Sequence, residues 1–171
     1  MRRAFSLIEL MIVIMIIGVV YTLAITKLKS VGDAQITPNF LHLKEYLLEI
    51  GKGAKEVTFI CLDDCSSCTI YGDGERLKEV ESWFDDSVRR YYYDVLAGAM
   101  LVKERVFFNE EGVQESVCFS FSVARSGISD QVIVLYKDRA YDYTSYFDAT
   151  KVYNSLSESI DEKQNLMQEV Q

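Results

Sequence analysis

The chain has 171 residues, of which 26 are Asp or Glu and 18 are Lys or Arg, so its formal net charge is −8. This acidic balance argues against a general affinity for nucleic acid or anionic lipid, because both carry negative charge themselves. One long apolar segment near the N-terminus precedes a polar remainder, which is long enough for one globular domain with a modest core.

The apolar segment spans residues 5–25, after Arg2 and Arg3, and Glu9 is its only charged residue. A helix of about 21 residues is about 31 Å long, enough to cross the hydrocarbon core of a bilayer. A carboxylate in lipid is costly unless it is paired or protonated. Glu9 is therefore a candidate functional residue.

The heptapeptide Ala4-Phe5-Ser6-Leu7-Ile8-Glu9-Leu10 resembles the class III signal of type IV prepilins and type II secretion pseudopilins. The resemblance covers about residues 1–30. It implies that prepilin peptidase removes a leader, residues 1–4, by cutting between Ala4 and Phe5, and that Phe5 is then methylated. Ala4 stands where the family usually has Gly, which predicts slower cleavage.

The resemblance also implies a role and a location. In this family the glutamate is thought to pair with the N-terminal amine of a neighbouring subunit, so that each charge offsets the cost of the other in lipid. The chain would cross the inner membrane once, through residues 5–26, with the leader in the cytoplasm and the domain in the periplasm or on the filament. The expected partners are prepilin peptidase, other pilin or pseudopilin subunits and the inner membrane, without nucleic acid or a cofactor.

Two other interpretations of the N-terminus stay open. One is an ordinary secretory signal peptide cut after Ala24, and the other is an uncleaved signal anchor. The corresponding alternative function is a periplasmic binding or enzymatic domain on an ordinary anchor. We do not expect an enzyme, because His42 is the only histidine and lies in a predicted helix, where a Ser–His or Cys–His pair is hard to build.

The expected fold is α+β, with a long N-terminal transmembrane helix whose second half packs on a small antiparallel sheet. Residues 27–51 form that second half, since apolar residues recur at helical spacing and Gly51 ends the pattern: Phe40, Leu43, Leu47 and Ile50. Thr37 and Pro38 predict a helix start. Residues 5–50 are thus one long helix, or two with a bend near Pro38.

Residues 52–154 are expected to form a pilin-like globular domain. Strands are predicted over residues 57–62 and 68–71, with a turn between them and a loop at 72–74. From Glu75 onward, Leu77, Val80, Phe84 and Val88 recur every three or four residues, which predicts a helix. Residues 88–97 carry conflicting signals and stay unassigned.

The later part of the domain is predicted to be strands. One covers residues 101–108, with a turn at 109–112. Three more, at 117–123, 131–136 and 140–144, are expected to form an antiparallel meander, the first showing a clear period of two. The polar tail, residues 155–171, opens with Ser155 and Glu158, a capping-box pattern for a last helix.

The cysteines Cys61, Cys65, Cys68 and Cys118 all follow the apolar segment. In an exported domain they can form disulfides, and we weigh two pairings. Cys61–Cys68 would tie the predicted hairpin and leave Cys65 for Cys118, or Cys65–Cys68 would form with Cys61–Cys118. A zinc site and a redox C-x-x-C are disfavoured, since there is one C-x2-C arm and no βαβ unit.

Two polar clusters complete the candidates. Asp63, Asp64, Asp73 and Glu75 do not match an EF-hand loop, so we expect solvated carboxylates and no metal site, although some pseudopilins bind calcium. The segment Arg89-Arg90-Tyr91-Tyr92-Tyr93 has the composition of a DNA-stacking patch. It is short and lies in an acidic domain, so core and surface roles are favoured.

The resemblance leaves the system open: type IV pilus, competence pseudopilus or type II secretion pseudopilus. Major pilins commonly close a loop near the C-terminus with a disulfide, whereas every cysteine here lies at or before position 118. This favours a minor pilin or a secretion-type pseudopilin.

Overall fold

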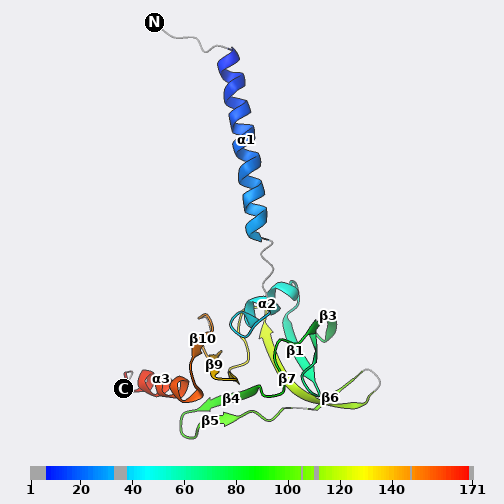
Figure 1. The fold of residues 1–171 in the computed structure, drawn as a ribbon, viewed down its shortest axis with the longest axis vertical. Helices are drawn as coiled ribbons and strands as arrows, with labels where there is room; N and C mark the ends of the chain where they lie inside the picture. The colour runs from blue at the N-terminus through cyan, green and yellow to red at the C-terminus, as the bar shows by residue number, and fades with distance from the viewer. Residues whose placement is uncertain (1–6, 33–37, 105, 110–111, 147, 170–171) are drawn as a thin grey trace. The chain divides into compact units, whose positions relative to one another are not determined.

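The structure, a computed structural model, describes residues 7–32, 38–104, 106–109, 112–146 and 148–169. The chain divides into two compact units, Met1–Ile36 and Thr37–Gln171, and each is described by itself. The first unit contains helix α1 (Leu7–Gly32). The second is an α+β domain with helices and antiparallel sheets (Figure 1).

The predicted second half of the long helix, residues 27–51, is divided: residues 27–32 belong to α1, and a separate short helix, α2 (Leu43–Ile50), follows. It begins at Leu43 and not at Pro38, because the chain first makes a turn in which the His42 main-chain N–H donates to the Asn39 side chain (2.9 Å). Within α2, Leu43 and Leu47 are fully buried against β1 and β7, as the apolar spacing predicts. The second half of the long helix was expected to cover a sheet, and within it α2 does so.

The first sheet has the strand order β3-β2-β1-β7-β6. Its strands are β1 (Glu56–Leu62), β2 (Ser67–Gly72), β3 (Glu75–Glu81), β6 (Val106–Phe108) and β7 (Gln114–Ala124). Val57, Phe59 and Cys61 alternate with half-exposed residues along β1, which is central and pairs with both β2 and β7. The predicted hairpin and the period-two strand are confirmed.

The helix predicted from Glu75 is wrong, because this segment begins with strand β3. Asp73 and Gly74 both have positive φ (51° and 87°) and form a two-residue turn that places Glu75 opposite Gly72. Asp-Gly is a strong local hairpin signal, and it could have identified this turn from the sequence. Pairing with β2 therefore outweighs the helical spacing of Leu77 and Val80.

The second sheet has the order β10-β9-β8-β4-β5. Its strands are β4 (Arg89–Asp94), β5 (Gly98–Leu101), β8 (Ile133–Tyr136), β9 (Arg139–Asp142) and β10 (Lys151–Tyr153). The unassigned residues 88–97 thus contain a strand. Over the described residues the fold has two five-stranded sheets, where one small sheet was expected.

The predicted meander is confirmed only in part: β8 and β9 pair antiparallel as expected, whereas β7 belongs to the first sheet. After β7 the chain turns at Gly127, and the Asp130 side chain accepts a hydrogen bond from the Ser122 main-chain N–H (2.9 Å). The predicted strand 101–108 is likewise divided, since β5 pairs with β4 and β6 pairs with β7.

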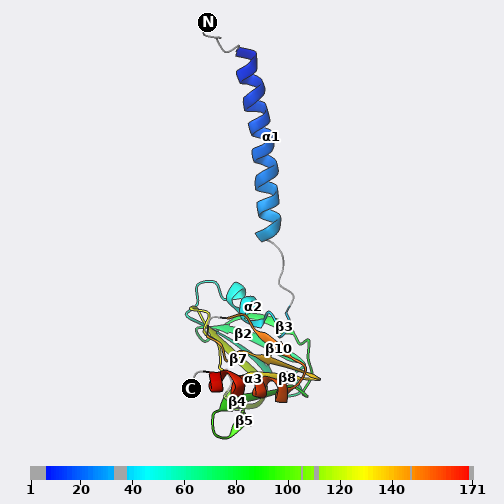
Figure 2. The ribbon, with the colours of Figure 1, turned by 90° about the vertical axis from the view of Figure 1, so that its left-hand side faces the viewer.

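The C-terminal segment forms helix α3 (Leu156–Glu169), which contacts β9 and β10 (Figure 2). The predicted cap is present, since the Ser155 hydroxyl accepts from the Glu158 main-chain N–H (3.1 Å). The Glu158 carboxylate accepts in turn from the Asn154 N–H (2.7 Å), one residue earlier than in a standard capping box.

Candidate functional site

The N-terminal segment carries the first candidate site. Ala4 and Phe5 lie outside the described residues, whereas Glu9 lies in the first turn of α1, where the helix dipole favours an acidic side chain. Between Ile8 and Tyr21 the large apolar side chains are all exposed, from 43% for Val13 to 77% for Met15. A helix that is apolar all round needs an apolar environment, either lipid or other helices.

Among the described residues, no helix combines the length and hydropathy that crossing a bilayer requires.

The cysteines form the second candidate set, and they are paired as Cys61–Cys68 and Cys65–Cys118. Cys61 lies directly opposite Cys68 on β1 and β2, with their Cα atoms 4.0 Å apart. Cys65, in the turn between these strands, is tied to β7 with a Cα separation of 5.4 Å. This is the first of the two pairings weighed from the sequence, and it locks three adjacent strands of the first sheet.

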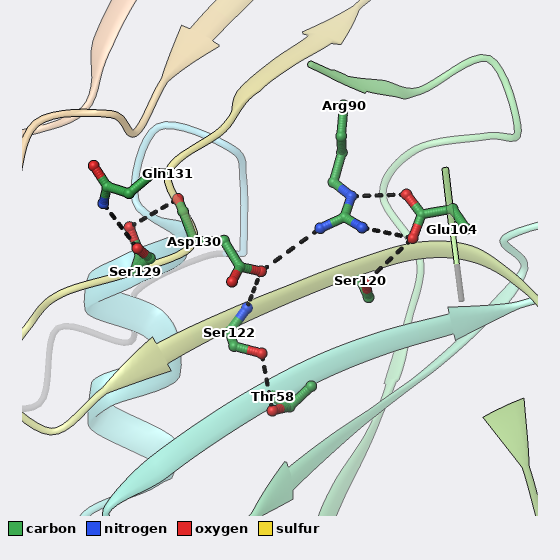
Figure 3. Close-up of polar contacts among 8 residues, drawn as sticks. All are labelled: Thr58, Arg90, Glu104, Ser120, Ser122, Ser129, Asp130 and Gln131. Atoms are coloured by element: carbon green, nitrogen blue, oxygen red, sulfur yellow. Dashed lines mark hydrogen bonds and ion pairs between the residues drawn. The ribbon is translucent and has the colours of Figure 1, made fainter. Parts of the chain in front are cut away.

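A part-buried polar network centred on Arg90 joins the two sheets (Figure 3). Arg90 on β4 is 8% exposed and donates two hydrogen bonds to Glu104 (Nε to Oε1 2.7 Å, Nη2 to Oε2 2.6 Å). Its Nη1 lies 3.6 Å from Asp130 Oδ2, which also accepts from the Ser122 N–H. Ser120 donates to Glu104, so both carboxylates connect Arg90 to β7.

The sequence did not predict this network, because its charged members are far apart in the chain and no local pattern joins them. In the sequence, Arg90 belongs only to the candidate DNA-stacking segment, residues 89–93. In the structure its guanidinium is occupied by Glu104 and Asp130, and that of Arg89 donates to the main-chain oxygens of Asp86 and Val88. Arg90 is thus buried within the domain, whereas Arg89 is exposed at the surface.

The acidic residues that lie close together in the sequence do not form one cluster. Asp73 and Asp64 accept main-chain hydrogen bonds in two different turns. Asp73 accepts from the main-chain N–H groups of Lys55 (2.9 Å) and Glu56 (3.0 Å), and these bonds hold the pKa of its carboxyl below the ordinary value. Asp64 accepts from Ser66 (3.0 Å), with the same effect on its pKa. Over the described part of the chain, no three His, Cys, Asp or Glu side chains are grouped to hold a metal ion.

His42 is exposed and occupies the N-cap position of α2. The outer face of the first sheet carries a groove of about 940 Å³, in which the Tyr71 and Phe107 rings lie 5.9 Å apart. Its charged lining includes Glu75, Arg76 and Glu115, and His42 lies elsewhere. The groove therefore offers no histidine for acid–base chemistry.

A single acidic residue in an apolar N-terminal helix, ahead of a disulfide-linked α+β domain, is the arrangement expected of a pilin-like protein. Comparison with known families supports this class. Residues 1–25 match the family described as "Prokaryotic N-terminal methylation motif", which is the signature of the prepilin-type cleavage signal of type IV pilins and pseudopilins. This match includes Ala4, Phe5 and Glu9, and it confirms the resemblance inferred from the heptapeptide.

The match ends at residue 25 and so does not include the domain. Comparisons of the chain with curated proteins and with solved structures found no match. The motif implies processing by prepilin peptidase and assembly with other pilin subunits.

Proposed function

We propose that this chain is a structural subunit, a minor pilin or a pseudopilin, of a type IV pilus or a type II secretion pseudopilus. The observation that carries the proposal is the methylation motif at residues 1–25, within which Glu9 is the only charged residue of the apolar run. Prepilin peptidase would remove residues 1–4, and Phe5 would become the methylated N-terminus.

Assembly follows from the chemistry of α1. Its apolar side chains would move from lipid to the helices of neighbouring subunits, which keeps them away from water. The Phe5 amine and the Glu9 carboxylate are both costly in an apolar environment, and each lowers the cost of the other when they pair between subunits. Only one axial register brings the two groups together, so Glu9 would set the subunit spacing.

The domain supports a role outside the cytoplasm, at the inner membrane before assembly and at the filament surface afterwards. All four cysteines form disulfides, which persist in oxidising compartments. The polar network around Arg90 and the two disulfides favour rigidity. We propose a structural and not a catalytic function.

Mass spectrometry of the protein from its native host tests this proposal. We expect a mature chain that begins with methylated Phe5 and that keeps Met1 when prepilin peptidase is deleted. The variant Ala4→Gly, which restores the usual residue of the signal, should be cleaved faster. A mature chain that begins at Ile25, or that keeps Met1 in the presence of the peptidase, would overturn the proposal.

A further inference from the structure

The hairpin of β4 and β5 carries an exposed apolar surface that the processing motif does not explain. Leu96, at its tip, is 98% exposed, and Val95 and Leu101 are 68% and 57% exposed. The tip is held in one conformation, because the Asp94 carboxylate accepts hydrogen bonds from the N–H groups of Leu96 and Ala97 (both 2.8 Å). Large apolar side chains are therefore held in solvent by an ordered turn.

Strand β5 is also an open edge of the second sheet. It pairs with β4 in the register Tyr92↔Met100, and Val102 N–H donates to the Arg90 carbonyl oxygen (2.8 Å). Because antiparallel hydrogen bonds alternate along a strand, Ala99 and Leu101 direct their N–H and C=O groups away from β4. In the described part of the chain, β5 lies at the end of the strand order, so a further strand could pair with it.

The other described edges differ in their protection. Strand β3 carries charges at most positions, which discourages pairing with another chain, and β10 is contacted by α3. Strand β6, the other edge of the first sheet, also has exposed apolar side chains, but it is only three residues long. Around β5, in contrast, residues 95–102 contain no charge. Two copies of a chain with a net charge of −8 can approach each other at this edge without direct repulsion between strands.

We propose that β5 pairs antiparallel with β5 of a second copy of this chain, joining the second sheets of two subunits. The two-fold axis would pass beside Met100, so that Ala99 and Leu101 form hydrogen-bonded pairs with the partner's Leu101 and the partner's Ala99. In the same register Lys103 lies opposite the partner's Ala97. The proposal does not depend on the processing motif.

Charge complementarity favours a second copy of this chain as the partner of β5. Lys103 is exposed, and the Asp94 carboxylate lies 2.8 Å from the Ala97 N–H. Opposite the partner's Ala97, the flexible lysine side chain can therefore reach the partner's Asp94 carboxylate. The two-fold axis repeats this ion pair, so one register satisfies the open strand edges and both lysines together. Such a two-fold contact closes at two copies and does not itself extend a filament.

Hydrogen exchange of the full chain in detergent micelles tests the proposal. As the ratio of protein to micelles rises, exchange of the Ala99 and Leu101 amides should slow, whereas the Met100 amide, which faces β4, should be protected throughout. Sedimentation measured in parallel should show dimers. Association through α1 alone would leave the Ala99 and Leu101 amides unprotected, and that result would overturn the proposal.

Charge variants test the register. Lys103→Glu should weaken dimerisation about tenfold, since it places two carboxylates together on each side of the axis. The double variant Lys103→Glu with Ala97→Lys should restore dimerisation, because the lysine introduced at position 97 faces the glutamate introduced at position 103 of the partner. Lys151→Glu, an exposed change of the same charge on β10, is the matched control and should have no effect. The proposal would be contradicted if Lys103→Glu dimerised as strongly as the parent. It would also be contradicted if the protein stayed monomeric and bound lipid vesicles through Leu96.

Discussion

The Tyr143 hydroxyl donates a hydrogen bond to the main-chain carbonyl oxygen of Phe40, a residue far earlier in the chain. Phe40 is 3% exposed, and its ring lies near those of several core aromatic residues: Trp83, Phe84, Phe119, Tyr136 and Tyr141. Burial raises the pKa of the Tyr143 phenol well above its ordinary value, so the hydroxyl remains a donor at physiological pH. The contact attaches the N-terminal end of the domain to its core.

Tyr143→Phe should lower the free energy of unfolding by about 1–3 kcal/mol, because the buried Phe40 carbonyl loses its donor. Urea denaturation of the oxidised protein would measure the loss. Tyr136→Phe is the control, since the Tyr136 hydroxyl donates only a long hydrogen bond to exposed Asp85 (3.5 Å). Equal losses in the two variants would show that the Phe40 contact has no special importance.

The two disulfides should differ in their contribution to stability. They close sequence separations of 53 residues for Cys65–Cys118 and 7 for Cys61–Cys68. Loop-closure entropy therefore predicts losses of about 4 kcal/mol and about 2 kcal/mol when both cysteines of a pair are replaced by Ala. Thermal unfolding of the two double variants would measure these losses. A larger loss for Cys61–Cys68 would mean that strain or packing, and not chain entropy, dominates.

Glu104→Leu should destabilise the domain by about 3–5 kcal/mol, because buried Arg90 would lose its two-bond partner and keep only the longer contact with Asp130. The comparison is Glu79→Leu, which removes the exposed ion pair with Arg76 and should cost under about 1 kcal/mol. Chemical denaturation of each variant separates these outcomes. Similar values would indicate that Arg90 is not effectively desolvated.

Stability should decrease in acid in part through Asp73. Main-chain N–H groups of Lys55 and Glu56 hold its pKa below the ordinary value of 3.8 in the folded state, so the unfolded chain binds this proton more readily. The contribution is complete above pH 3.8 and is lost as the pH falls through the lower, folded-state pKa. In thermal melts across this range, Asp73→Asn should flatten the pH dependence. Asp138→Asn, in the exposed β8–β9 turn, should behave like the parent.

Glu9→Leu should leave the protein anchored and its domain folded but prevent its incorporation into filaments, because the partner for the Phe5 amine is removed. Membrane fractionation and immunoblotting of sheared filaments measure the two properties separately. Ile12→Leu, an apolar change on the same helix, is the control and should assemble normally. Normal incorporation of Glu9→Leu would remove the role proposed for this carboxylate.

Local patterns predicted much of the domain, with clear exceptions. The hairpin of β1 and β2, strand β7 and the Ser155 cap follow from alternation and capping chemistry, which act between near neighbours. Strand β3 differs from the predicted helix, because the Asp73-Gly74 turn and the pairing with β2 outweigh the helical spacing of Leu77 and Val80. The division of residues 101–108 between two sheets has no local signal, since it depends on which distant strand lies beside each part.

The amino-acid sequence by itself determined the processing motif, the lone Glu9 and the need for an apolar environment around residues 5–25, because each depends on residue types at close spacing. The sequence also narrowed the disulfide connectivity of the four cysteines to two alternatives. Tertiary structure alone decided between those pairings, brought Arg90 to Glu104 and Asp130, and left β5 as an open edge. The Cys65–Cys118 bond and the Arg90 contacts join segments far apart in the chain, and the edge of β5 depends on the strand order of the second sheet, so they exist only once the two sheets have formed and packed.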